Sequence, residues 1–182
     1  AGLPKSTVFG LLTTMRDYDV ITQHADGKYA LGLCLFEYGC RASAFWNISS
    51  LARPYLEHLA EATGASAMLS TYENGHIVAL DQAEGRDSLR IVSAPGARLP
   101  LHCTSQGKIV LAHMSESEAS KLLSRAAPLT PFTPHTETDA AALLASLPAC
   151  REAGFAVENG EYKIGLRSIS APVYTVEGEV RY

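Results

Sequence analysis

Residues 99–111 read LPLHCTSQGKIVL, a stretch that changes from an extended pattern to a helical one within a few positions. Leu99 to Cys103 predicts a short extended segment. Thr104 follows, and threonine is one of the residues whose side chain accepts backbone N–H groups at the start of a helix. We expect this helix to turn one face to a hydrophobic core, at Gly107, Val110, Leu111 and Met114.

Upstream of this stretch the sequence predicts a helix followed by strands. Strands are expected at 67–72 and 77–82, because the two runs flank Asn74-Gly75, a pair that favours the tight turn of a hairpin. A third strand is expected at 89–93. Antiparallel strands interleaved with helices indicate the α+β class.

Downstream, helices and strands continue to alternate. The capping box Ser115-x-x-Glu118 predicts one helix start, and Thr138 or Asp139 predicts another. The second helix should end near Gly154, and Pro148 should kink or shorten it. The last elements expected are strands at 155–158 and 166–174.

The first part of the chain predicts a helix at 5–15, a hairpin around Asp26-Gly27 and a second helix at 31–45. A third helix is expected to be capped by Ser49 or Ser50 and to stop at Gly64. A helix followed at once by a hairpin is the layout of a winged helix. The other interpretation is an ordinary amphipathic helix and hairpin of an α+β domain, and the spacing alone leaves both open.

One face of the first helix is short and polar, of a size that fits a DNA major groove. The charges of residues 1–46 nevertheless cancel, with four basic and four acidic side chains, whereas binding to phosphates normally needs several cations. A recognition helix also needs a supporting helix before it, and none precedes Ala1. The chain is therefore expected to begin partway through such a domain.

Composition excludes several classes of protein. Of the 182 residues, 47% are hydrophobic and 19% are charged, which is typical of a globular chain. No apolar run approaches the roughly 18 residues that a membrane span needs, and the start lacks a signal-peptide layout, so we expect a cytoplasmic protein. The cysteines and histidines show no metal-binding spacing, so no metal, cofactor or disulfide is expected.

Six segments together resemble the IclR family of bacterial transcription regulators. They occur in family order and spacing over nearly the whole chain: residues 5–12, 27–32, 52–56, 99–108, 154–156 and 165–173. The resemblance implies an incomplete winged helix-turn-helix at 1–32, a linker helix at 33–47 and an effector-binding domain at 48–182. That domain would be GAF-like, an antiparallel sheet flanked by helices.

The resemblance also implies contacts with double-stranded operator DNA. The expected DNA-binding residues lie on the groove-facing side of the first helix and in the wing: Lys5, Ser6, Thr7, Phe9, Thr13 and Lys28. Gly10 departs from the family pattern, which usually has a basic residue there. A mid-helix glycine also costs about 1 kcal/mol relative to alanine, so weaker binding or a different base preference is expected.

The effector of such a regulator is expected between the sheet and the helix that starts at Thr104. Backbone N–H groups of Ser105 and Gln106 at a helix N-terminus favour a carboxylate, so the expected effector is a small organic acid. The expected contacts are Ile91, Thr104, Ser105, Gln106, Glu158, Leu166, Ser168 and Ser170. The competing interpretations are that Thr104 and Ser105 only cap the helix, that the two strand serines are satisfied within the fold, and that Glu158 is a solvated loop carboxylate.

Two other functions remain to be weighed. An enzyme would use Cys103 as nucleophile and His102 as base, but neighbouring residues of an extended segment point to opposite faces. A sensor or adaptor domain without a DNA role would make the first thirty residues a mere connector. We therefore expect a non-enzymatic, effector-controlled regulator that works as a homodimer or a dimer of dimers, because paired recognition helices need two copies.

Overall fold

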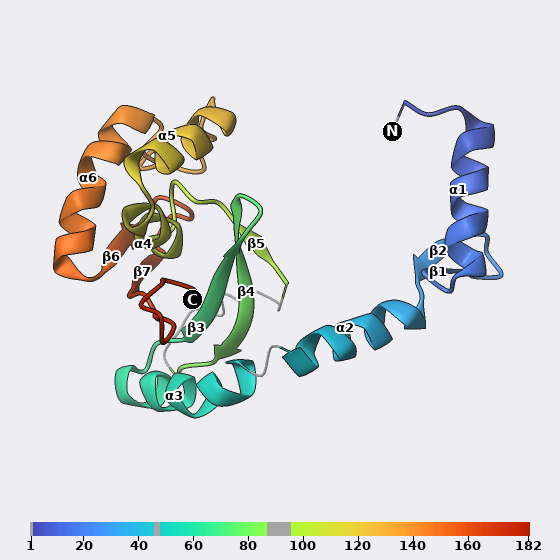
Figure 1. The fold of residues 1–182 in the computed structure, drawn as a ribbon, viewed down its shortest axis with the longest axis horizontal. Helices are drawn as coiled ribbons and strands as arrows, with labels where there is room; N and C mark the ends of the chain where they lie inside the picture. The colour runs from blue at the N-terminus through green and yellow to red at the C-terminus, as the bar shows by residue number, and fades with distance from the viewer. Residues whose placement is uncertain (1, 46–47, 87–95) are drawn as a thin grey trace. The chain divides into compact units, whose positions relative to one another are not determined.

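The computed structural model describes residues 2–45, 48–86 and 96–182 of the chain (Figure 1). The chain forms two compact units, Ala1–Leu51 and Ala52–Tyr182. Every strand pairing within the described residues is antiparallel, and helices separate the hairpins. This mixed architecture agrees with the predicted α+β class.

The first unit is a helix, a hairpin and a second helix. Helix α1 (Lys5–Asp17) follows Pro4, strands β1 (Ile21–Gln23) and β2 (Tyr29–Leu31) pair antiparallel, and α2 spans Leu33–Phe45. Gly27 has φ +82° at the hairpin turn, a conformation that glycine adopts without steric cost. The predicted order of elements is confirmed.

Helix α1 packs little of its surface within this chain. Of the predicted apolar stripe, Val8 and Leu12 are half-buried, whereas Leu11 and Met15 are exposed. Phe9, predicted for the opposite face, is 69% exposed. The predicted division of α1 into two faces is confirmed only in part, because Thr13, predicted for the outward face, is half-buried and no residue of α1 is fully buried.

Helix α3 (Ile48–Thr63) leads into the sheet of the second unit. It begins before Ser49, so the predicted cap at Ser49 or Ser50 is wrong, although the end at Gly64 (φ +72°) is confirmed. Strands β3 (Ala67–Glu73) and β4 (His76–Ala83) form the predicted hairpin, and β5 (Arg98–Leu99) adds to β4. The third strand predicted at 89–93 lies outside the described residues.

Three helices cover the core of the second unit. They are α4 (Ser105–His113), α5 (Glu116–Arg125) and α6 (Ala140–Ala153), and their predicted caps are confirmed at Thr104, Ser115 and Asp139. Gly154 ends α6 with φ +75°. Pro148 does not shorten α6, which continues for another turn. We attribute this to packing, because Leu143 and Leu147 belong to the hydrophobic core and hold the helix against it.

The last hairpin joins β6 (Ala156–Asn159) to β7 (Arg167–Ser170), with Glu158 opposite Ser168. The predicted strand at 166–174 is thus too long: after Ser170 the chain leaves the ladder. Pro172, which lacks an N–H group for the ladder, lies just beyond this end. Helix α4 packs against α6 and against both strands of this hairpin.

Candidate functional site

The start of α4 is wound tightly against the segment before it. The hydroxyl of Thr104 accepts the N–H of Gly107 (3.1 Å) and donates to the carbonyl of Pro100 (2.7 Å). A Cβ atom on Gly107 would lie 2.1 Å from the carbonyl oxygen of Leu101, so only glycine fits. This close approach carries Ser105 into the interior, where it is completely buried.

Ser105 meets two serines of β7 there. Its Oγ lies 2.8 Å from Oγ of Ser168 and 2.7 Å from Oγ of Ser170. Ser168 also donates to Oε2 of Glu158 at 3.3 Å. A serine hydroxyl has one proton, so Ser105 must donate to Ser168 and accept from Ser170. The four side chains form one directed chain of hydrogen bonds that ends on the carboxylate.

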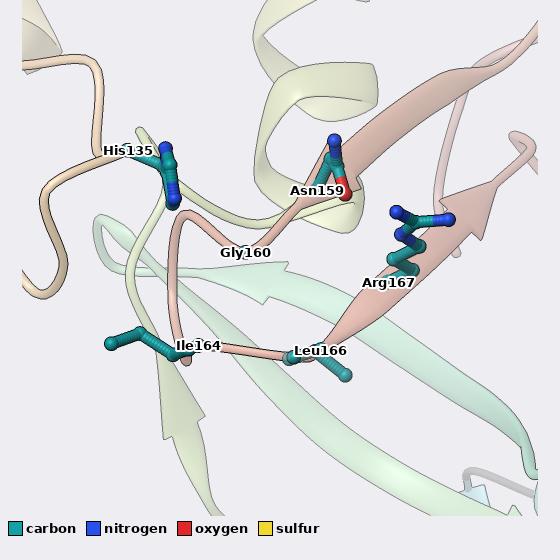
Figure 2. Close-up of a pocket in the computed structure, with 7 residues that line it drawn as sticks. His135, Asn159, Gly160, Ile164, Leu166 and Arg167 are labelled. Carbon is teal, nitrogen blue, oxygen red and sulfur yellow. The ribbon is translucent and has the colours of Figure 1, made fainter.

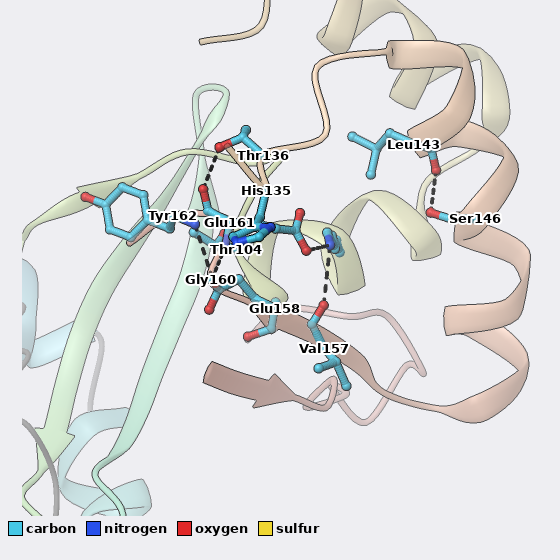
Figure 3. Close-up of polar contacts among 12 residues, drawn as sticks. Thr104, His135, Thr136, Leu143, Ser146, Val157, Glu158, Gly160, Glu161 and Tyr162 are labelled. Atoms are coloured by element: carbon cyan, nitrogen blue, oxygen red, sulfur yellow. Dashed lines mark hydrogen bonds and ion pairs between the residues drawn. The ribbon is translucent and has the colours of Figure 1, made fainter. Parts of the chain in front are cut away.

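The carboxylate of Glu158 is fully buried and is held by backbone amides. Its Oε1 accepts the N–H groups of Glu161 (2.6 Å) and Tyr162 (3.1 Å) (Figure 3). These bonds offset the cost of burying a carboxylate. The alternative that Glu158 is a solvated loop carboxylate is therefore wrong. The alternative that Ser168 and Ser170 find their hydrogen-bond partners within the fold describes their contacts correctly.

An ion pair between α4 and the β6–β7 loop closes one side of this cluster. Nζ of Lys108 pairs with Oε1 of Glu161 and also donates to the carbonyl of Val157. Both charged side chains are only 14% exposed. The sequence analysis missed this pair, because two residues 53 positions apart leave no periodic signal.

The remaining predicted effector residues are distributed as follows. Gln106 is half-buried and its amide nitrogen lies 3.6 Å from the sulfur of Met68 on β3. Within the described part of the chain, no backbone carbonyl accepts the N–H groups of Ser105 or Gln106. Leu166 is half-buried just before β7, and Ile91 lies outside the described residues. The structure thus brings Ser105, Glu158, Ser168 and Ser170 together. Leu166 does not join them and instead lines a cavity with Asn159 and Arg167.

The chemistry of Cys103 argues against the nucleophile hypothesis. Burial, together with the nearby carboxylates of Glu161 and Glu158, raises the pKa of the Cys103 thiol to about 12. An activated cysteine needs the opposite shift. Nε2 of His102 lies 2.9 Å from the carbonyl oxygen of Thr130, so its ring is engaged elsewhere.

The predicted DNA-binding side chains are mostly exposed. Lys5, Ser6, Thr7 and Phe9 lie on the outside of α1, and Thr13 is half-buried. Lys28 forms an ion pair with Asp26 (3.1 Å) at the hairpin turn. In the described ranges no three metal-ligating side chains come together, and no helix there is long and apolar enough to cross a membrane.

Known proteins resemble this chain over nearly its whole length. The family model described as bacterial transcriptional regulator IclR, C-terminal, matches residues 41–182. The HTH-type transcriptional regulator XynR of Escherichia coli strain K12 is 34% identical over 98% of this chain and 71% of its own length. The HTH-type transcriptional repressor AllR of the same strain is 30% identical over 98% of this chain and 66% of its own length.

A solved structure agrees with these sequence matches. The crystal structure of an IclR homologue from Microbacterium hydrocarbonoxydans, complexed with 4-hydroxybenzoate, has a TM-score of 0.82 at 26% identity, covering 98% of this chain and 74% of that one. The relatives are named as regulators and not as enzymes. The family match covers most of the chain, and the fold agrees with it. The chain therefore belongs to the IclR family of bacterial transcriptional regulators.

Proposed function

We propose that this chain is the effector-sensing part, with a portion of the DNA-binding domain, of a transcription regulator controlled by a small organic acid. The observation that carries the proposal is the buried chain of hydrogen bonds from Ser170 through Ser105 and Ser168 to Glu158. Polar side chains gathered in the interior beside a helix N-terminus provide directional contacts for a small polar ligand. We also propose that the effector-binding domain has a GAF-like fold.

The two ends of this cluster differ in what they would accept. The N–H groups of Ser105 and Gln106 and the dipole of α4 favour a carboxylate. The carboxylate of Glu158, already holding two backbone amides, would repel an acid and accept a hydroxyl instead. An effector would therefore place its acid group at the helix and a hydroxyl or ring edge at Ser168 and Glu158.

Binding would also rearrange the cluster. Ser105 and Glu158 are fully buried, so a ligand can reach them only if the hydrogen bonds between α4 and β7 exchange partners. Such a change at the start of α4 gives the effector a means to favour one of two arrangements of the protein, which is what allosteric control of DNA binding requires. The Microbacterium homologue binds 4-hydroxybenzoate, a small acid that carries a hydroxyl group, which supports an effector of this class.

We propose that α1 and the β1–β2 hairpin are the recognition helix and wing, and that the protein binds double-stranded operator DNA as a homodimer or dimer of dimers. The outward positions of Lys5, Ser6, Thr7 and Phe9 and the names of the relatives support this assignment. The cancelling charges of residues 1–46 favour a second candidate, a sensor or adaptor domain without a DNA role.

A thermal-shift panel tests the effector class. Small carboxylates, with 4-hydroxybenzoate among them, are compared with their uncharged amides. We expect at least one acid to raise the melting temperature and its amide to have little effect, because only the acid gains from the helix terminus. Equal stabilisation by the amides would show that the terminus is not an anion site and that the pocket is chiefly apolar.

Single substitutions test whether the effector binds at the Ser105 cluster. Because Ser105 is fully buried, a bulky residue there would disrupt packing, so Ser168, which is half-buried, is the better target. Ser168→Ala should weaken binding by about 1 kcal/mol, the contribution of one neutral hydrogen bond. Ser120→Ala, a half-buried serine on α5, is the matched control and should bind normally.

A further inference from the structure

A cavity lies beside the β6–β7 hairpin, apart from the Ser105 cluster. It has a volume of about 280 Å³ and is lined by His135, Asn159, Gly160, Ile164, Gly165, Leu166 and Arg167 (Figure 2). This volume is just below the range of roughly 300–1,000 Å³ typical of sites for drug-sized ligands, so it suits a smaller molecule.

The hairpin separates this cavity from the Ser105 cluster. Side chains alternate between the two faces of a strand, so Asn159 and Arg167 point away from the face that carries Glu158 and Ser168. Asn159 and Arg167 are also direct partners in the β6–β7 register, which brings their side chains together on this face. Leu166 contributes to the rim of the cavity.

The walls of the cavity are held in place by hydrogen bonds between distant segments. The hydroxyl of Thr133 donates to the carbonyl of Gly160 (2.6 Å), and the hydroxyl of Thr136 donates to the carbonyl of Glu161 (2.6 Å). The N–H of Gly160 donates to the carbonyl of Leu166 at 2.7 Å. These contacts fix the turn that carries His135 against the hairpin, so the cavity exists before any ligand arrives.

The polar side chains that line the cavity have no partners of their own in the described part of the chain. No hydrogen bond or ion pair there involves the guanidinium of Arg167, the amide of Asn159 or the ring of His135. The nearest acid in sequence, Glu161, is turned inward and paired with Lys108. A guanidinium without a carboxylate partner attracts an oxyanion, which it holds with two parallel hydrogen bonds.

We propose that this cavity binds a small organic acid with an apolar body, at a site separate from the Ser105 cluster. Arg167 holds the acid group, Asn159 and His135 supply further hydrogen bonds, and Ile164 and Leu166 contact the apolar body. The apolar residues select an organic acid over an inorganic anion, because phosphate gains nothing from contact with them. The proposal goes beyond the effector site proposed above and does not depend on it.

Titration of the chain with benzoate, followed by the backbone amide signals of Gly160 and Gly165 in NMR, tests the proposal. Acetate and inorganic phosphate serve as comparison anions. We expect benzoate to saturate these signals at a concentration at least fivefold lower than either comparison anion. Equal binding of all three would overturn the proposal, because the site would then respond to negative charge alone.

Variants of exposed residues identify the contact without threatening the fold. Arg167→Met should weaken benzoate binding at these signals at least tenfold, and Arg167→Lys should restore only part of it, because lysine lacks the planar fork. Lys163→Met is the matched control: Lys163 lies in the same loop, 5.5 Å from the centre of the Tyr162 ring, and does not line the cavity. An equal loss in Lys163→Met would show that diffuse positive charge, and not Arg167, attracts the anion.

Ser168→Ala separates this proposal from the effector proposal. If benzoate occupies the outer cavity, Ser168→Ala leaves the response of Gly160 and Gly165 unchanged while Arg167→Met removes it. If Ser168→Ala removes the response and Arg167→Met does not, the ligand lies at the Ser105 cluster, and the outer site is refuted while the effector proposal stands.

Discussion

Gly107 is the residue on which the geometry of the Ser105 cluster depends most directly. It sits in the first turn of α4, where the backbone of Leu101 occupies the space that a side chain would need. A side chain at this position would force α4 and the Leu101 segment apart and would disturb the placement of Ser105, two residues away. The missing side chain therefore sets how closely α4 approaches the Leu101 segment.

We predict that Gly107→Ala lowers the free energy of unfolding of the second unit by about 1–3 kcal/mol, the cost of overpacking a close contact. Urea unfolding followed by circular dichroism measures it. Gly10→Ala is the control, because Gly10 in α1 has open space around its Cβ position. Alanine there should stabilise the helix by about 1 kcal/mol. Destabilisation by both alanines would contradict the role assigned to the Leu101 contact.

At the scale of single elements, the start of α5 carries a complete capping box. The hydroxyl of Ser115 accepts the N–H of Glu118, and the carboxylate of Glu118 accepts both the N–H and the hydroxyl of Ser115. These hydrogen bonds hold the pKa of Glu118 below its ordinary value. The carboxylate therefore stabilises the fold above its ordinary pKa, and this contribution is lost as the pH falls through the lowered value.

Ser115→Ala should destabilise the protein by about 1 kcal/mol at neutral pH, the usual cost of losing an N-terminal cap. The pKa of Glu118 should return toward its ordinary value, which an NMR titration of its side chain measures. Ser117→Ala provides the control, since Ser117 is exposed in the same turn. Equal effects of the two substitutions, or an unchanged Glu118 titration, would contradict a stabilising role for the Ser115–Glu118 capping box.

At the scale of the whole molecule, the proposed DNA binding can be tested at two exposed basic residues, Lys5 and Lys28. Lys28 is paired with Asp26, but the two side chains are 83% and 55% exposed. An exposed ion pair contributes little, so a phosphate can displace Asp26. Lys5 lies at the start of α1, where a phosphate would also meet the positive end of the helix dipole.

In the full-length protein, Lys5→Ala and Lys28→Ala should each weaken binding to any DNA sequence and reduce the slope of log affinity against log salt by about 1. Salt titrations of operator and unrelated DNA measure both effects. Lys121→Ala, on the exposed side of α5 in the second unit, should leave the slope unchanged. Unchanged slopes for both α1 and hairpin variants would favour the sensor or adaptor function.

Short stretches of the sequence determine the turns, helix caps and helix ends of this protein. The turns at Asp26-Gly27 and Asn74-Gly75, the caps at Thr104, Ser115 and Asp139, and the stop at Gly154 were all predicted correctly. Each depends on residues at most a few positions apart, whose backbone preferences and hydrogen bonds act before any tertiary contact forms. The period-two pattern likewise placed Ser168 and Ser170 on one face of β7.

Long-range contacts decided the rest. Pro148 was expected to shorten α6, but the helix continues, with Leu143 and Leu147 packed on the core. The sequence nominated Ser105, Glu158 and Ser168 for a ligand, but only the packing of α4 on β7 bonds them to one another and closes the cluster. The Lys108–Glu161 pair and the cavity at Arg167 had no sequence signal at all. Their partners lie in segments far apart in the chain, and the fold alone determines which side chains share a low-dielectric interior and which face an open cavity.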